Sequence, residues 1–322
     1  MPNAYSSDAH SPPALIRAGT RGSPLALVQT RDLLARLRPH APAAVLEEHI
    51  IRTTGDQVQD RPLAEIGGKG LFAKEIHEAL EAGRIDLAVH SLKDLETALP
   101  DGIVLACVLA REDARDVLIL PPGAPTPDPA DPFAVLPSGA VVGSSSVRRR
   151  SQLLHARPDL AMALLRGNVQ TRLARVADGT CAASLLALAG LKRLGLEAHA
   201  SAVLDPEAMV PSACQGIVGV TARASDAALL ALLAQVEDAD ARVVSDAERA
   251  MLASLDGSCR TPIGAYARLL PDGQMNLTGL VARADGSFLL KRSLHGPRAD
   301  AARLGAELGD SLRADSPPDV FA

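Results

Sequence analysis

The stretch LIRAGTRGSPLALVQTRDLLARL, residues 15–37, decides the class of fold. A short apolar run, LIRAGT, leads through a turn, RGSP, into apolar residues at helical spacing. Working outward, residues 45–54 predict a second strand, residues 70–84 a helix that ends at Gly83, and residues 86–95 (DLAVHSLKDL) a buried strand that enters a loop. This alternation indicates βαβ units and a parallel sheet with helices on both faces.

The pattern restarts after a proline-rich segment, residues 121–132, which we interpret as a surface loop. Residues 140–157 (AVVGSSSVRRRSQLLHAR) predict strand, turn and helix, and residues 166–179 another helix. Residues 211–222 indicate a loop and a strand, followed by helices over 226–255. Residues 265–296 alternate with period two around two Asp-Gly turns, and residues 297–312 predict a final helix. We therefore expect two α/β lobes and a smaller α+β domain with a small antiparallel sheet.

The composition excludes several classes of protein. The chain has 322 residues and a net charge of −5, and no apolar run approaches the ~20 residues of a membrane span. It has no Trp and only 2% aromatic residues, which leaves little for base stacking on single-stranded nucleic acid. The first 14 residues predict no secretory signal, and four scattered cysteines predict neither a disulfide scaffold nor a zinc cluster. We expect a cytoplasmic protein whose arginine clusters bind a small anionic ligand.

Two strand-to-helix turns are candidate anion sites. Arg21 and Ser23 stand in RGSP, and three serines precede three arginines in GSSSVRRR, residues 143–150. Helix N-termini attract anions, and an arginine there adds a bidentate contact with a carboxylate or phosphate. The alternatives are an ordinary capping serine followed by proline in the first motif and a solvated basic first turn in the second. Arg166 and Arg172, in RGNVQTR, form a weaker pair of the same kind.

Three further positions carry candidate chemistry. Lys93 and Asp94 follow a buried strand, at the edge of the sheet where ligands bind in α/β folds, although a structural salt bridge is the alternative. Lys69, in a glycine-rich loop, could reach an anion. Cys259, beside Arg260, predicts a reactive thiol, with an inert buried cysteine as the alternative. His90 is interpreted as a packed strand-end residue, and Cys107 and Cys181 as inert.

Together these segments resemble the porphobilinogen deaminase (hydroxymethylbilane synthase) family from about Leu15 to the last helix. The matching blocks, in order, are TRGSPLAL, GGKGLFAKE, AVHSLKD, REDARD, GSSSVRRR, LRGNVQTRL, AGLKRLG, AERAML and LDGSCRTPIG. The resemblance implies two lobes like those of a periplasmic binding protein and a C-terminal α+β domain. The implied divisions are a tail over 1–13, a first domain over 14–109 and 217–234, a second over 115–210, and a third over 239–322.

The resemblance also implies the reaction, which condenses four porphobilinogen molecules into hydroxymethylbilane and loses ammonia at each step. A dipyrromethane cofactor would be bound by a thioether to Cys259. Asp94 would be the catalytic carboxylate that assists loss of ammonia and stabilises the cationic azafulvene. The implied cofactor-binding residues are Cys259, Lys93, Asp94, Ser144, Ser146, Arg148, Arg149 and Gln215. The implied substrate-binding residues are Arg21, Ser23, Arg149, Arg166, Arg172 and Lys69, and no metal is expected.

Some positions depart from the family pattern. Glu65 stands where relatives often have lysine, Ala182 where aspartate is common, and Cys214 where a glycine is usual, which predicts a stiffer hinge. The expected partner is porphobilinogen alone, with no nucleic acid and no membrane, and the chain is expected to be a monomer. Two other classes stay open: a two-lobed solute-binding or ligand-sensing protein without catalysis, and a phosphate-handling transferase that uses the Arg/Ser loops.

Overall fold

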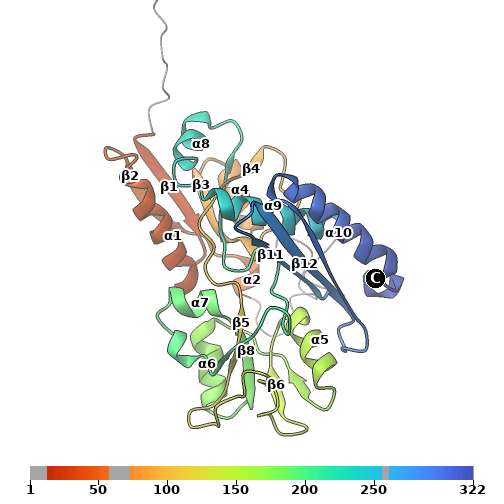
Figure 1. Cartoon of the computed structure of the whole chain (residues 1–322). Helices are drawn as coiled ribbons and strands as arrows, with labels where there is room; N and C mark the ends of the chain where they lie inside the picture. Colours follow the sequence, from red (N-terminus) through yellow and green to blue (C-terminus); the bar gives the residue numbers. More distant parts are fainter. Residues whose placement is uncertain (1–12, 58–72, 256–260, 322) are drawn as a thin grey trace, which may run out of the picture.

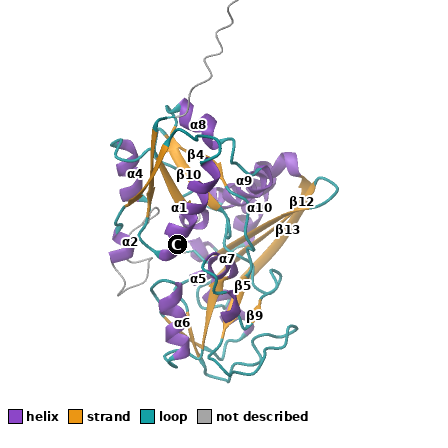
Figure 2. Cartoon of the chain, turned by 90° about the vertical axis from the view of Figure 1, so that its left-hand side faces the viewer, coloured by secondary structure: helices purple, strands orange, loops and turns teal. Residues whose placement is uncertain are grey.

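The computed structural model describes residues 13–57, 73–255 and 261–321. It contains two five-stranded sheets, each with its own helices, and a separate three-stranded sheet. Figures 1 and 2 show the two larger sheets as separate lobes and the small sheet to one side of their junction. The expected class of fold, two α/β lobes with a C-terminal α+β unit, is confirmed.

The first lobe is built on a sheet with the strand order β2-β1-β3-β10-β4. Its strands are β1 (Leu15–Thr20), β2 (Val45–Ile50), β3 (Leu87–Ser91), β4 (Ile103–Val108) and β10 (Val218–Arg223). β1 is parallel to β2 and β3, but β10 is antiparallel to both its neighbours. The expectation of a parallel sheet is therefore confirmed for β1, β2 and β3 and wrong for β10. β10 returns from the second lobe, so Val218 enters the sheet opposite Ser91, where β3 ends.

The second lobe repeats this exception. Its strand order is β7-β6-β8-β5-β9. The strands are β5 (Asp116–Ile119), β6 (Val141–Gly143), β7 (Ala161–Ala163), β8 (Ala183–Ala187) and β9 (Ala202–Val203). β6 is parallel to β7 and β8, whereas β5 is antiparallel to β8 and β9. β5 arrives from the first lobe, and its first residue, Asp116, lies opposite Ala187 at the end of β8.

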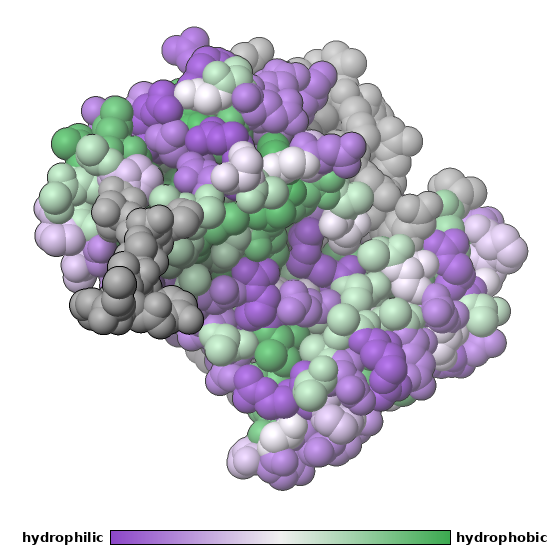
Figure 3. All heavy atoms as spheres, turned by 90° about the horizontal axis from the view of Figure 1, so that it is seen from above, coloured by the Kyte–Doolittle hydropathy of each residue, from purple (hydrophilic) through white to green (hydrophobic). Residues whose placement is uncertain are grey.

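Helices connect the strands much as the apolar periodicity predicts. The helices are α1 (Pro24–Leu37), α2 (Thr54–Gln57), α4 (Lys74–Glu81), α5 (Val147–Ala156), α6 (Val169–Ala177), α7 (Leu188–Arg193), α8 (Ala227–Leu233), α9 (Ala239–Ser254) and α10 (Ala301–Asp315). In the described part of the chain, no helix has both the length and the apolar character that a membrane span requires. Figure 3 views the molecule from above relative to Figure 1, and it shows hydrophilic residues over much of that face, with hydrophobic residues among them.

Serine and asparagine side chains begin three of these helices. Ser23 accepts a hydrogen bond from the Ala26 amide, Ser146 from the Arg149 amide and Asn168 from the Thr171 amide. Each side chain satisfies one of the amides that an α-helix leaves unpaired at its start. The capping interpretation of RGSP is confirmed, with Pro24 in the first helical position.

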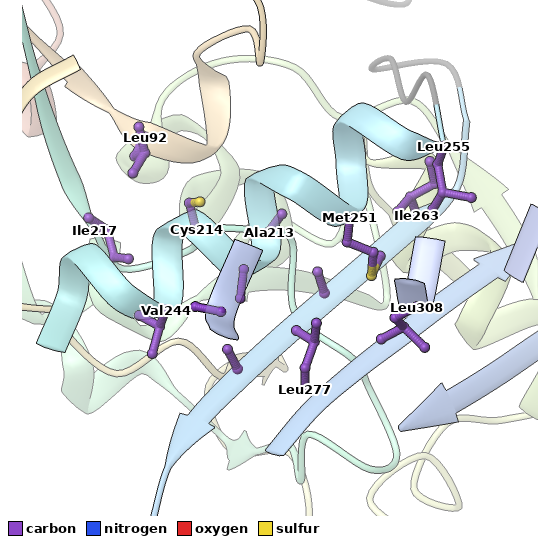
Figure 4. Close-up of a cluster of buried hydrophobic side chains, with 14 of the residues drawn as sticks. Leu92, Ala213, Cys214, Ile217, Val244, Met251, Leu255, Ile263, Leu277 and Leu308 are labelled. Atoms are coloured by element: carbon purple, nitrogen blue, oxygen red, sulfur yellow. The ribbon is translucent and has the colours of Figure 1, made fainter. Parts of the chain in front are cut away.

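The third unit packs α9 and α10 against β11 (Ile263–Leu269), β12 (Gln274–Ala282) and β13 (Leu289–Pro297). The three strands form the antiparallel meander that residues 265–296 predict. Its core contains Met251, Leu277 and Leu308, and the same cluster continues to Leu92 and Cys214 (Figure 4). Leu92 begins the turn that carries Asp94, so the third unit and that turn share one hydrophobic core.

The chain crosses between the lobes twice, from β4 to β5 and from β9 to β10, and the second crossing contains a strained residue. Among the described residues, Cys214 is the one non-glycine residue with a positive φ, which is 60°. L-residues with a Cβ are disfavoured in this left-handed region by roughly 1–2 kcal/mol. A glycine at this position would carry no such cost.

Replacing Cys214 by Gly is therefore expected to give a more stable protein than replacing it by Ala, by about 1 kcal/mol. Both variants lose the buried thiol, but only Ala keeps a Cβ in the left-handed region. Denaturant unfolding of the two variants measures the difference. Equal stability, or a more stable Ala variant, would show that the backbone at Cys214 is unstrained.

Candidate active site

A cavity of about 990 Å³ lies where the two lobes and the third unit meet. The first lobe contributes the turn after β1 and the end of β3, and the second lobe contributes the first turns of α5 and α6. Residues of the third unit, including Leu252 and Thr261, also line it. β5 and β10, the strands that follow the two crossings, begin opposite Ala187 and Ser91, and both of these residues line the cavity. Side chains from distant segments of the chain therefore gather there.

The first lobe places Arg21, Ser23, Lys93 and Asp94 on the cavity wall. Lys93 and Asp94 lie on a 3₁₀ turn, Leu92–Asp94, directly after β3. Asp94 is exposed towards the cavity and Lys93 is half-buried. The Lys93 Nζ donates to Gln215 Oε1 at 3.2 Å, and no carboxylate of the described residues lies within ion-pair distance of it, which disfavours the structural salt bridge that was its alternative.

The second lobe contributes Arg148 and Arg149 from the first turn of α5. Both are buried, with 4% and 5% of their surface exposed, so the alternative of a solvated basic turn is wrong for these two residues. Arg148 donates to the Val210 carbonyl at 2.6 Å and Arg149 to the Leu185 carbonyl at 3.0 Å. Both also pair with Asp116, at 2.8 Å each.

Asp116 is a fully buried carboxylate. Burial opposes its ionisation, but Arg148 and Arg149 outweigh this effect and hold the pKa of Asp116 well below its usual range. Gln215 donates a further hydrogen bond to it at 2.8 Å. Sequence reasoning missed this residue, although it ends the REDARD block, because its partners lie far from it along the chain.

Arg166 and Arg172 line the same cavity at the start of α6. Arg172 donates from Nε to the Gly167 carbonyl at 3.0 Å, and Arg166 donates from Nη2 to the Gly55 carbonyl at 3.4 Å. Burial lowers the pKa of Arg172 to about 10, and repulsion from Arg149 and Arg166 adds to the effect. Arg172, on α6, thus lies close enough to Arg149, on α5, and to Arg166, just before α6, for their charges to interact.

Other predicted residues have different surroundings. Ser146 lines the cavity and caps α5. Ser144 is not among the lining residues in the described part of the chain; its Oγ accepts a hydrogen bond from the Ser146 amide at 3.2 Å. Cys259, Lys69 and Glu65 lie outside the described residues.

His90, Cys107 and Cys181 are all buried, as expected of a packed strand-end residue and two inert cysteines. His90 is buried, faces Thr221 Oγ1 at 3.1 Å, and burial lowers its pKa to about 3. Cys107 and Cys181 are buried, and burial raises the pKa of Cys107 to about 12, which makes its thiolate rare. His90 also belongs to the cavity wall, which the sequence did not indicate.

Two more arginines line the cavity that sequence reasoning did not include. Arg193, at the end of α7, donates to the Gly216 carbonyl at 2.7 Å, and Arg52 follows β2. The AGLKRLG block contains Arg193, so the block itself was the available signal. The cavity is thus lined by many more cationic than anionic side chains, an arrangement suited to a polycarboxylate.

Comparison with known proteins accounts for most of the chain. The model of the porphobilinogen deaminase dipyromethane cofactor binding domain matches residues 16–231, and that of the porphobilinogen deaminase C-terminal domain matches residues 242–314. Porphobilinogen deaminase from Paracoccus denitrificans (strain Pd 1222) is 48% identical over 308 residues, 95% of this chain and 96% of that protein. The chloroplastic porphobilinogen deaminase of Oryza sativa subsp. japonica is 46% identical over 324 residues, 99% of this chain and 88% of that protein.

Solved structures align more distantly. The periplasmic aliphatic sulphonate binding protein SsuA from Escherichia coli is 16% identical, with a TM-score of 0.40, over 76% of this chain and 71% of that one. The matches to the two domain models and to the relatives, by contrast, span nearly the whole chain. The chain therefore belongs to the porphobilinogen deaminase family.

Proposed function

We propose that Asp94 is the catalytic carboxylate of this porphobilinogen deaminase and that the surrounding arginines bind the carboxylates of its substrate and cofactor. The reaction condenses four porphobilinogen molecules into hydroxymethylbilane, with release of ammonia, in tetrapyrrole biosynthesis. The observation that carries the proposal is the exposed Asp94 carboxylate in a cavity otherwise lined mainly by cationic side chains.

The residues present fit a dipyrromethane cofactor. Each pyrrole carries an acetate and a propionate group, and guanidinium groups bind carboxylates bidentately. We propose that Arg148, Arg149, Lys93, Gln215, Ser146 and Ser144 hold the cofactor. Its attachment would be the Cys259 thiol, and Thr261, two residues further along the chain, lines the cavity. When bound, the cofactor supplies the pyrrole carbon to which the first substrate molecule is joined.

The chain's own residues supply binding and electrostatic stabilisation. Arg21, Ser23, Arg166, Arg172 and Lys69 are proposed to bind the acetate and propionate groups of porphobilinogen. As ammonia leaves the substrate, positive charge develops on its pyrrole ring. A fixed carboxylate at Asp94 stabilises that charge and can hold a proton in transit.

Arg148 and Arg172 are expected to respond oppositely to replacement by Leu. Arg148→Leu removes one of the two guanidiniums from the buried Asp116 and is expected to destabilise the fold by roughly 3–5 kcal/mol. Among the described residues, no carboxylate lies within ion-pair distance of Arg172, and Arg149 and Arg166 repel it. Arg172→Leu is therefore expected to keep the melting temperature and to raise the KM for porphobilinogen roughly tenfold or more.

Thermal unfolding and steady-state kinetics of the two variants provide the check. Equal losses of stability in both variants would contradict the distinction, as would an unchanged KM in Arg172→Leu.

Incubation with porphobilinogen tests the proposed function against the two other classes. The deaminase consumes porphobilinogen and releases ammonia, and both are measured directly. A solute-binding or ligand-sensing protein would bind it without releasing ammonia, and a phosphate-handling transferase would leave it unchanged. Either of those outcomes with purified, folded protein would overturn the proposal.

We further propose the domain divisions 14–109 with 217–234, 115–210 and 239–322. The chain is proposed to act as a monomer, on its small-molecule substrate and without nucleic acid, in the cytoplasm or a similarly reducing compartment. The support for the last point is that Cys107, Cys181 and Cys214 are free and buried.

A further inference from the structure

Behind the cationic wall of the cavity lies the Asp116 carboxylate, which none of the roles above uses. Its Oδ2 accepts from Arg148 Nη2 at 2.8 Å. Its Oδ1 accepts from Arg149 Nε at 3.2 Å, from Arg149 Nη2 at 2.8 Å and from Gln215 Nε2 at 2.8 Å. Asp116 has no exposed surface, so these donors alone compensate its loss of water.

Gln215 extends this network to the first lobe. Its side-chain oxygen accepts from Lys93 Nζ at 3.2 Å and from Arg149 Nη2 at 3.5 Å. Its amide nitrogen donates to Asp116 and to the Ala114 carbonyl, at 2.6 Å for the latter. A chain of hydrogen bonds therefore runs from Asp116 through Gln215 to Lys93, the neighbour of Asp94.

The charges in this network are unequal. Lys93, Arg148 and Arg149 contribute three positive charges around one buried carboxylate, and Asp94 is the other acid that faces Lys93. Burial lowers the pKa of Lys93 to about 8; Asp94 and Asp116 oppose this decrease, and Arg149 and Arg148 add to it. Removal of Asp116 would take away the negative charge that offsets these cations and the acceptor that both guanidiniums share.

We infer that Asp116 is a positioning residue of the active site: it fixes Arg148, Arg149 and Gln215 and supplies the negative charge that lets Lys93 stay protonated beside two guanidiniums. The inference rests on the proposed role of these cations as carboxylate binders. Its test needs no porphobilinogen, so failure of the inference and failure of the proposed function are distinguishable.

The test titrates Lys93 in the protein as purified. Trace labelling with acetic anhydride across pH, with peptide mass spectrometry, gives the titration midpoint of each lysine. The chain has only five, Lys69, Lys74, Lys93, Lys192 and Lys291, so the peptides are few. In Asp116→Asn, which keeps the shape and removes the charge, we expect the Lys93 midpoint to fall by about 0.5–1 pH unit. The exposed Lys74 should keep its midpoint and serves as the internal reference.

A matched control separates this effect from general loosening of the fold. Glu248 is also fully buried, and it pairs at 2.7 Å with Arg111, which lies in the segment that crosses from β4 to β5. Within the described ranges, its hydrogen bonds go to Arg111, Cys214 and Ala267 and not to Lys93, Arg148 or Arg149. Glu248→Gln should therefore destabilise the protein without moving the Lys93 midpoint.

Gln215→Met is the second variant, because it breaks the link between Asp116 and Lys93 without removing a charge. This variant should also lower the Lys93 midpoint. If Asp116→Asn does not fold, the Lys93 midpoint in Gln215→Met decides the test. An unchanged midpoint in the folded variants overturns the inference. Equal shifts in Asp116→Asn and Glu248→Gln overturn it as well, since the shift would then reflect lost packing.

Discussion

Replacing Asp94 by Asn is expected to lower the turnover of porphobilinogen by at least about two orders of magnitude. Asp94 is exposed to the cavity at the end of the turn after β3, in a wall rich in cations. The substitution keeps the size of the side chain and removes its negative charge, which favours a developing cation. Steady-state rates at saturating substrate measure the loss, and the melting temperature should stay at the wild-type value.

Two variants sharpen this expectation. Asp94→Glu should keep more activity than Asp94→Asn, because the charge matters more than the reach of the side chain. Asp101→Asn removes an exposed carboxylate seven residues away that does not line the cavity, and it should keep full activity. Near-normal turnover by Asp94→Asn, or an equal loss in Asp101→Asn, would contradict the proposed role.

Replacing Cys259 by Ala is expected to abolish both the bound cofactor and the activity. The native protein should weigh more than its sequence by two porphobilinogen units less the ammonia lost in coupling. Cys259→Ala should show the bare mass of the sequence, because no other cysteine is suited to form the thioether. Cys107, Cys181 and Cys214 are buried, and burial raises the pKa of each thiol.

Intact-mass measurement decides this prediction without an activity assay. Cys107→Ala and Cys181→Ala are the matched controls and should both keep the added mass. A wild-type protein that is active at the mass of its bare sequence would refute the thioether at Cys259. An unchanged added mass in Cys259→Ala would place the attachment elsewhere.

Local signals in the sequence determined the elements. The turn RGSP predicts a helix start, and Ser23 and Pro24 occupy the cap and first positions of α1. Alternation of strand and helix predicts the two α/β lobes, and period-two alternation with Asp-Gly turns predicts the meander of β11, β12 and β13. These features depend on residues that are neighbours along the chain, so short windows contain the information.

Motifs in the sequence likewise indicated most of the cavity wall. Arg21, Lys93, Asp94, Arg149 and Arg172 all line one cavity, as their positions at strand ends and helix starts predict. Their separate motifs contain no information about distance, and the family resemblance was what grouped them.

Only the tertiary structure decided the strand directions and the charge balance. β5 and β10 are antiparallel to their neighbours because each enters its sheet from the other lobe, a property of the whole path of the chain. Asp116 meets Arg149 33 residues later and Gln215 99 residues later, and no local pattern encodes such a meeting. Short stretches of sequence therefore predict which side chains can bind carboxylates. Long-range packing decides that Asp116 is the carboxylate of the protein that pairs with Arg148 and Arg149. Because Asp116 is buried, it must pair with such donors.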